Sequence, residues 1–152
     1  RVSIDLEILS EFELWVAYTV DIWNARLLGE VFQSYSDDAL LHCSRNQTLK
    51  GREEIAASYA QIIGTVTQLK FSHDYCCCIP NDNGGKDIAV RWTITGNHGG
   101  AGLYGEPTGT PLLILGESQF RIIDGLIAEE WTIFDELSII VQIYRSRLSC
   151  AE

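Results

Sequence analysis

The feature that most constrains the fold is a change in the spacing of apolar residues near the middle of the chain. Over 69–79 apolar and polar residues alternate, and the run at 81–85, Asn-Asp-Asn-Gly-Gly, is typical of a tight turn, because Asn and Gly tolerate positive φ. The segment 87–95 then predicts the return strand of a hairpin. Two further runs, 112–123 and 126–134, flank Asp124-Gly125 and predict a second hairpin. The second half of the chain therefore predicts a meander of long antiparallel strands.

The first half has helical spacing instead, with apolar residues at three- and four-residue steps. The expected elements are, in order, a helix over 12–27 with a bend at Asn24, a short helical stretch over 28–35, a turn over 36–38, a short strand over 39–44 and a helix that begins after Gly51. The segment 136–144 is apolar enough for a last strand or a short helix. Helices followed by strands predict an α+β fold. We expect residues 1–152 to form a single domain, in which a strongly curved antiparallel sheet wraps around the N-terminal helices and encloses a conical pocket suited to a small molecule.

Composition excludes several classes of function. The 152 residues are 46% hydrophobic, which is too apolar for a disordered chain. With 11 basic and 21 acidic residues the net charge is -10, so nucleic acids and anionic membranes are poor partners. No apolar run approaches the roughly 20 residues of a membrane span, and no signal-peptide pattern opens the chain. The chain begins with Arg1 and contains no Met, so we expect a trimmed start.

Cysteine usage predicts reduced thiols in a cytoplasmic protein. Of the five Cys, three are consecutive, Cys76, Cys77 and Cys78. Neighbouring residues on a strand point to opposite faces, so these thiols cannot converge on one metal ion. We expect no metal and no cofactor.

Asp135 is the first candidate for chemistry. One face of the preceding strand carries Glu129, Trp131 and Ile133, and if that face lines the pocket, Asp135 lies in apolar surroundings that raise its pKa towards neutral. A carboxyl group with such a pKa can transfer a proton. The alternative is a structural role, because Asp135 precedes Glu136-Leu137-Ser138 and Asp is a favoured N-cap of helices.

Arg91 and Arg121 lie in the middle of two predicted strands. An arginine there is often exposed to solvent or paired across strands. The alternative is an inward side chain that polarises a substrate oxygen or pairs with Asp135, and such pairing would lower the pKa of that carboxyl.

Histidines and aromatic residues complete the candidate site. His98 lies between glycines that would orient its imidazole, and the alternative is a hydrogen-bonded loop residue. We expect structural roles for His42 and, as a core or wall residue, for His73. The candidate catalytic residues are Asp135, His98 and Arg91, and the candidate substrate-binding residues are Tyr18, Tyr59, His73, Trp92, Arg121 and Trp131.

Several motifs, taken in order, resemble the SnoaL-like polyketide cyclases over most of the chain, from about Tyr18 to Tyr144. These motifs are Asp-Ile-Trp-Asn at 21–24, Tyr-Ser-Asp-Asp-Ala at 35–39, Gly-Arg-Glu-Glu-Ile at 51–55, Ile-Ala-Val-Arg-Trp-Thr at 88–93, Gly-Asn-His-Gly-Gly at 96–100, Gly-Glu-Pro-Thr-Gly at 105–109, Phe-Arg-Ile-Ile-Asp-Gly-Leu-Ile at 120–127, and Glu-Glu-Trp at 129–131 with Asp135. Each motif is weak alone, whereas their joint order and spacing are fairly specific.

The resemblance implies a cystatin-like α+β barrel of the nuclear transport factor type and a homodimer or higher oligomer. It implies cofactor-free intramolecular aldol condensation of a polycyclic polyketide ester, with Asp135 at the position of the general acid/base. The wider superfamily also contains ring isomerases, dehydratases, epoxide hydrolases and non-catalytic members.

Three hypotheses follow. The first is an enzyme that transfers protons at Asp135, with His98 and Arg91 orienting substrate oxygens. The second is a binding module that holds a small hydrophobic or aromatic ligand without catalysis. The third is an assembly module whose cavity is filled by its own side chains.

Overall fold

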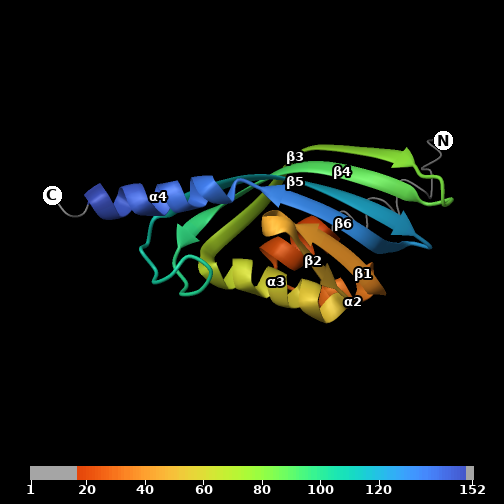
Figure 1. Cartoon of the computed structure of the whole chain (residues 1–152), viewed down its shortest axis with the longest axis horizontal. Helices are drawn as coiled ribbons and strands as arrows, with labels where there is room; N and C mark the ends of the chain where they lie inside the picture. The colour runs from red at the N-terminus through yellow and green to blue at the C-terminus, as the bar shows by residue number, and fades with distance from the viewer. Residues whose placement is uncertain (1–16, 150–152) are drawn as a thin grey trace, which may run out of the picture.

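The computed structural model describes residues 17–149, so the part of the predicted first helix before Ala17 lies outside the described residues. The sheet and helices of Figure 1 confirm the α+β fold. The elements are, in order, η1 (Ala17–Asn24), η2 (Leu28–Glu30), α2 (Val31–Ser34), β1 (Tyr35–Cys43), η3 (Ser44–Asn46), β2 (Gln47–Lys50), α3 (Arg52–Thr65), β3 (Val66–Pro80), β4 (Lys86–His98), β5 (Pro111–Ile123), β6 (Leu126–Phe134) and α4 (Glu136–Ser149).

Six strands form one curved sheet in the order β2-β1-β6-β5-β4-β3. Both predicted hairpins, β3–β4 and β5–β6, pair antiparallel. The sheet is curved and unclosed, as expected for a sheet that wraps around helices. The expectation of a wholly antiparallel sheet was wrong, because β1 pairs in parallel with β6 after the helical first segment. The expected turn at 36–38 lies inside β1, and β2 was missed.

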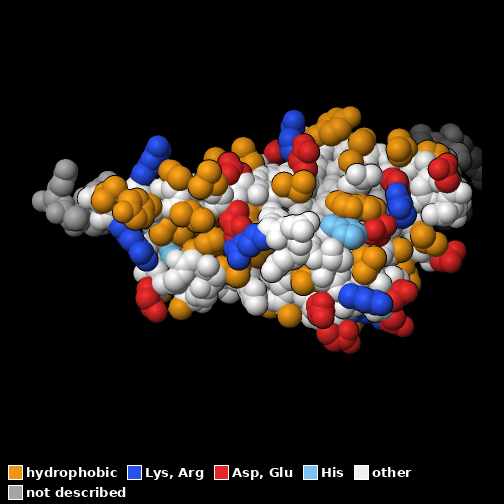
Figure 2. All heavy atoms as spheres, in the orientation of Figure 1, with side chains coloured by type: hydrophobic (Ala, Val, Ile, Leu, Met, Phe, Trp, Pro, Cys, Tyr) orange, Lys and Arg blue, Asp and Glu red, His pale blue; other side chains and the backbone are white. Residues whose placement is uncertain are grey.

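The sheet has a covered inner face and a more open outer face. In Figure 1 the helical segment before β1 and α3 lie against the inner face, whereas α4 extends away from the body. Figure 2 shows hydrophobic side chains on the surface at the α4 end of the molecule, where α4 exposes Leu137, Ile140, Tyr144 and Leu148. The difference between the two faces is clear in strand β5, whose residues are alternately exposed and buried from Pro111 to Phe120. None of the helices within residues 17–149 has the length and apolar run that crossing a bilayer requires.

Helix α3 is held to the sheet by the residues that flank it. Gly51 adopts φ 85, a conformation that favours glycine, and its N–H bonds to the carbonyl of Ala39. Arg52 donates from Nε to the Tyr35 carbonyl at 2.6 Å and forms an ion pair with Asp37 at 2.7 Å. The motifs at 35–39 and 51–55 therefore serve to dock α3, and they place Tyr59 of that helix against the inner face.

Asn24 ends η1 and ties it to β3. Its Nδ2 donates to the Phe71 carbonyl at 3.0 Å, and its Oδ1 accepts the Phe71 N–H at 2.7 Å. The predicted bend at Asn24 is thus a site where a side-chain amide pairs with the backbone of a strand.

Replacing Asn24 should destabilise the protein measurably. Asn24→Ala leaves both backbone groups of Phe71 without their partner, and we expect a loss of about 1–3 kcal/mol in the free energy of unfolding. Asn24→Asp keeps the acceptor but places a carboxylate oxygen against the Phe71 carbonyl, so it should also be destabilised. Urea denaturation measures both, and equal stability of Asn24→Ala and wild type would contradict this account.

Candidate active site

A buried carboxyl group, that of Glu130, lies at the centre of the inner face. It is 0% exposed and comes from β6. A β-bulge puts it there, since Arg121 of β5 pairs with Glu129 and the next residue, Ile122, pairs with Ile127, leaving Ala128 as the extra residue. The bulge reverses the alternation, so that Ile127 and Glu130 both point inward and Glu129 points outward.

Two tyrosines hold this carboxyl. Tyr35 and Tyr59 each place a hydroxyl 2.6 Å from Glu130 Oε2, and their hydroxyl oxygens lie 2.9 Å apart. Three such contacts need three protons, but the two phenols supply two. A protonated Glu130 supplies the third, so the neutral carboxyl satisfies the whole triangle, whereas the ionised carboxyl leaves the contact between the tyrosines without a proton.

The electrostatics agree with this proton count. Burial raises the pKa of Glu130 above its ordinary value, and the hydrogen bonds from Thr132, Tyr35 and Tyr59 offset that rise only in part. Burial and the nearby Glu130 charge raise the pKa values of Tyr35 and Tyr59 well above the ordinary value, so both phenols remain protonated.

A row of hydroxyls extends the cluster along the sheet. Thr132 donates to Glu130 Oε1, and its Oγ1 lies 2.7 Å from Ser118 Oγ. Ser118 accepts the indole N–H of Trp92 at 2.9 Å and lies 3.4 Å from the Tyr18 hydroxyl. Hydroxyl groups therefore connect Glu130 through Thr132 and Ser118 to Tyr18.

The cluster borders an apolar cavity of about 30 Å³. Its walls include Tyr59 and Thr132 together with Trp92 and Phe134. A second cavity of about 80 Å³ adjoins it and also has Tyr59 and Thr132 in its wall. Tyr59 and Thr132 are therefore two residues that contact the Glu130 carboxyl and also border the space in which a ligand would bind.

Three of the predicted binding residues lie in this region. Tyr18, Tyr59 and Trp92 are all buried, and Tyr18 packs edge-on against Phe120 with ring centroids 4.7 Å apart. Tyr59 and Trp92 line the cavity itself.

Asp135 lies elsewhere. Its side chain is exposed, and its Oδ1 accepts the Ser138 N–H at 2.9 Å, which is the N-cap of α4. The face of β6 that lines the cavity is therefore the one with Glu130, Thr132 and Phe134, not the face with Glu129, Trp131 and Ile133. The acid/base role of Asp135 stays a prediction.

His98 is buried under the 99–110 loop rather than in the wall of either cavity. Its Nδ1 lies 3.0 Å from Thr108 Oγ1, and its carbonyl accepts the N–H groups of Thr108 and Gly109. Burial and then the charge of Arg147 lower the pKa of His98, which favours the neutral imidazole. These contacts correspond to the alternative stated for His98, a residue hydrogen-bonded to a loop rather than one that faces a substrate.

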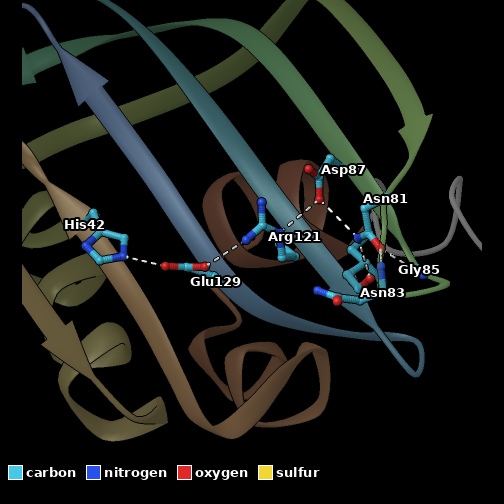
Figure 3. Close-up of polar contacts among 8 residues, drawn as sticks. His42, Asn81, Asn83, Gly85, Asp87, Arg121 and Glu129 are labelled. Carbon is cyan, nitrogen blue, oxygen red and sulfur yellow. Dashed lines mark hydrogen bonds and ion pairs between the residues drawn. The ribbon is translucent and has the colours of Figure 1, made fainter.

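His73 is an exposed residue of β3 opposite Trp92, whereas Arg91, Arg121 and Trp131 lie on the outer face. Figure 3 shows a chain of polar contacts there, in which Glu129 accepts from His42 at 2.8 Å and from Arg121 at 3.3 Å, and Arg121 also bonds to Asp87 at 3.3 Å. Trp131 stacks on His42 and lies under the Arg121 guanidinium. Arg91 and His73 are exposed, so neither is in the cluster around Glu130.

Within residues 17–149, no three His, Cys, Asp or Glu side chains are grouped as metal ligands. The sequence reasoning missed Glu130 and its partner Tyr35. Glu130 does fall on the face that contains Thr132, but only the bulge decides which face is inward, and a bulge at an alanine leaves no signal in the sequence pattern.

Glu130 also predicts how stability depends on pH. Its folded-state pKa is raised, so over a range above the ordinary value of about 4.3 the folded chain keeps a proton that the unfolded chain has lost. The stability contribution is full below that ordinary value and is lost as pH rises through the folded pKa. Urea unfolding across this range should show a fall in wild type that Glu130→Gln lacks, and identical pH dependence in the two proteins would contradict a raised pKa.

Comparisons with known proteins identify the family and the fold. A sequence model described as SnoaL-like polyketide cyclase matches residues 13–143. A candidate SnoaL-like polyketide cyclase from Jannaschia sp. CCS1 superposes with a TM-score of 0.76 at 18% identity, covering 94% of this chain and 95% of that one. IdmH, a candidate polyketide cyclase from Streptomyces antibioticus, superposes with 0.70 at 18% identity, covering 89% and 98%.

A protein of ketosteroid isomerase-like fold from Catenulispora acidiphila, in complex with trimethylamine, superposes with a TM-score of 0.68 at 14% identity, covering 87% of this chain and 92% of that one. At these identities the structures support the fold alone. No curated protein matches the sequence.

Proposed function

Since this chain belongs to the SnoaL-like polyketide cyclase family, we propose that it is a cofactor-free acid/base enzyme that closes a ring in a hydrophobic, polyketide-like molecule by an intramolecular aldol reaction. The observation that supports this most is Glu130. It is a fully buried carboxyl with a raised pKa, and it is hydrogen-bonded to Tyr59 and Thr132, two residues that border both cavities. Groups perturbed in this way cluster at active sites.

The proposed reaction uses both protonation states of Glu130. In the ionised state it takes the proton from the carbon next to a substrate carbonyl, through the hydroxyl of Tyr59 or Thr132, and an enolate forms. The enolate carbon attacks a second carbonyl of the same molecule, forming the carbon–carbon bond and leaving an alkoxide. Neutral Glu130 returns the proton to that alkoxide, so no atom is gained or lost.

The cavity supplies the setting for these steps. The apolar walls of Trp92 and Phe134 exclude water, which strengthens the hydrogen bond that a hydroxyl donates to the enolate oxygen. Tyr59 remains a donor because its pKa is raised.

Hydrogen–deuterium exchange tests the first step without knowledge of the natural substrate. Aromatic polycyclic esters with a β-keto side chain would be incubated with the protein in D₂O, and NMR would follow exchange next to the carbonyl while mass spectrometry follows ring closure. We expect faster exchange with the wild-type protein than in buffer. Exchange at the buffer rate for every ester would contradict the proposal.

A second candidate function, assembly, is favoured by the outer face. A groove of about 610 Å³ lies there, bordered by apolar side chains that are largely exposed, Tyr75 at 60%, Leu115 at 54% and Ile133 at 70%. Arg91 of β4 is the cross-strand neighbour of Glu117 in β5, and both border the groove. Adjacent opposite charges are self-complementary, because a second copy related by a two-fold axis can pair each Arg91 with the other Glu117. We propose a homodimer through this face.

A charge on this face should separate the copies. Ile133→Glu places a carboxylate in the apolar wall of the groove, and we expect it to convert a dimer to a monomer in sedimentation equilibrium. Phe32→Glu is the matched control, since Phe32 is an exposed apolar residue on α2. A monomeric wild-type protein, or a dimer that survives Ile133→Glu, would contradict this interface.

A further inference from the structure

The two inner cavities, of about 30 Å³ and 80 Å³, are individually far below the roughly 300 Å³ at the lower end of small-molecule sites. They share part of their walls, so they are neighbouring compartments of one space. The residues that line both are Tyr59, Ile62, Leu103, Tyr104, Thr132 and Phe134. Four of these belong to α3 or β6, and Leu103 and Tyr104 come from the 99–110 loop.

Leu103 and Tyr104 form the tip of a small, self-contained turn. Gly102 and Gly105 close it with a hydrogen bond in each direction, at 3.4 Å and 3.1 Å. Gly105 has φ 86, a conformation that favours glycine. The loop is anchored at its two roots, where the Gly100 N–H bonds to the Thr65 carbonyl and the Gly109 N–H to the His98 carbonyl. Between these roots the loop holds its tip against the cavity.

Polar contacts fix the Tyr104 ring at the boundary of the two compartments. The Tyr104 hydroxyl donates to Glu136 Oε1 at 3.1 Å. Arg45 binds the same carboxylate, with Nε 2.8 Å from Oε2, and lowers the pKa of Glu136, so the acceptor is charged. The inner compartment is apolar, whereas the outer one includes Arg45 and Glu136 in its wall.

We infer that the Tyr104 side chain separates an inner compartment beside Tyr59 from an outer compartment beside Arg45. Tyr104 thereby determines the size of the ligand that can bind. This inference rests on the proposed function for the kind of ligand, a flat oxygenated ring system. With the ring of Tyr104 in place the site admits the smallest ring systems. When the ring is absent or displaced, the two compartments join and admit a longer, fused ring system whose far end reaches the polar mouth.

Binding of a graded series of probes tests the inference. Phenol, naphthol and dihydroxyanthraquinone increase in ring number, and calorimetry would measure the affinity of each for wild type, Tyr104→Ala and Tyr104→Phe. We expect Tyr104→Ala to bind dihydroxyanthraquinone about tenfold or more tightly than wild type does, with phenol affinity changed by less than about threefold. Tyr104→Phe keeps the ring and should keep the wild-type order.

Tyr144→Ala is the matched control, because Tyr144 is an exposed tyrosine of α4. An unchanged order of affinities in a folded Tyr104→Ala protein would overturn the inference, and so would the absence of binding of all three probes to both proteins. Failure of the proposed function can be distinguished from failure of this inference. If the proposed function fails, deuterium exchange proceeds at the buffer rate. The shift in size preference is measured by binding alone and should persist in a Glu130→Gln background.

Discussion

Glu130→Gln is expected to slow the proposed proton transfer by roughly one hundred- to ten-thousand-fold, the usual contribution of a general acid/base. Glutamine matches glutamate in size and can accept from Thr132, Tyr35 or Tyr59 at its carbonyl, but it cannot take up a proton at neutral pH. The fold should therefore be retained while the reaction is lost. In wild type, kcat/KM should rise with pH through a pKa above that of ordinary glutamate, since the ionised carboxyl starts the reaction.

Asp135→Asn is the matched comparison, because asparagine is as good an N-cap as aspartate and keeps α4 stable. Deuterium exchange and ring closure would be measured for both variants, with circular dichroism as the check on folding. We expect Asp135→Asn to stay within about threefold of wild type, far from the loss typical of a general acid/base. The reverse result, loss in Asp135→Asn and retention in Glu130→Gln, would return the acid/base role to the residue that the family resemblance implies.

Gly116→Ala should destabilise the protein, with a loss of about 1–3 kcal/mol in the free energy of unfolding. Gly116 of β5 is the cross-strand partner of Trp92, and a Cβ built on it would overlap the indole ring. The indole cannot move aside cheaply, because its N–H bonds to Ser118 and its ring packs against Phe71. The added methyl group therefore forces the strand or the ring out of place.

Thermal and urea unfolding would measure this loss. Gly64→Ala is the control, since Gly64 lies in α3 with open space around its Cβ position. Alanine there should leave stability unchanged or raise it by up to about 1 kcal/mol through helix propensity. A Gly116→Ala protein as stable as wild type would show that Trp92 is not held rigidly against β5.

The hairpins could be predicted from sequence because their signals are local. The Asn-rich turn at 81–85 and the Asp124-Gly125 turn each join alternating runs that pair with each other. The pairing of β1 with β6 could not be predicted in the same way, since those strands are far apart in the chain and their parallel register depends on how the helical segment closes over the sheet. The last segment was ambiguous by pattern, and the cap by Asp135 shows why it begins a helix.

The site was predictable only where burial decides the position of a side chain. Tyr59 falls in the helical spacing of apolar residues in α3, and Trp92 falls in the apolar alternation of β4. Both residues line the cavity. Glu130 has the same residue type as its neighbour Glu129, and no local property distinguishes the two. Only the register of β6 against β5 separates the buried carboxyl from the one that pairs with Arg121 on the outer face.

Ala128 therefore has a consequence for how this protein is compared with its relatives. A strand with the same letters that paired without a bulge would present the first glutamate to the cavity and the second to solvent. An alignment that matches the letters and ignores the pairing register would then equate a buried carboxyl with a surface ion pair. For such comparisons, the register of β6 against β5 is as informative as the identity of the acidic residues themselves.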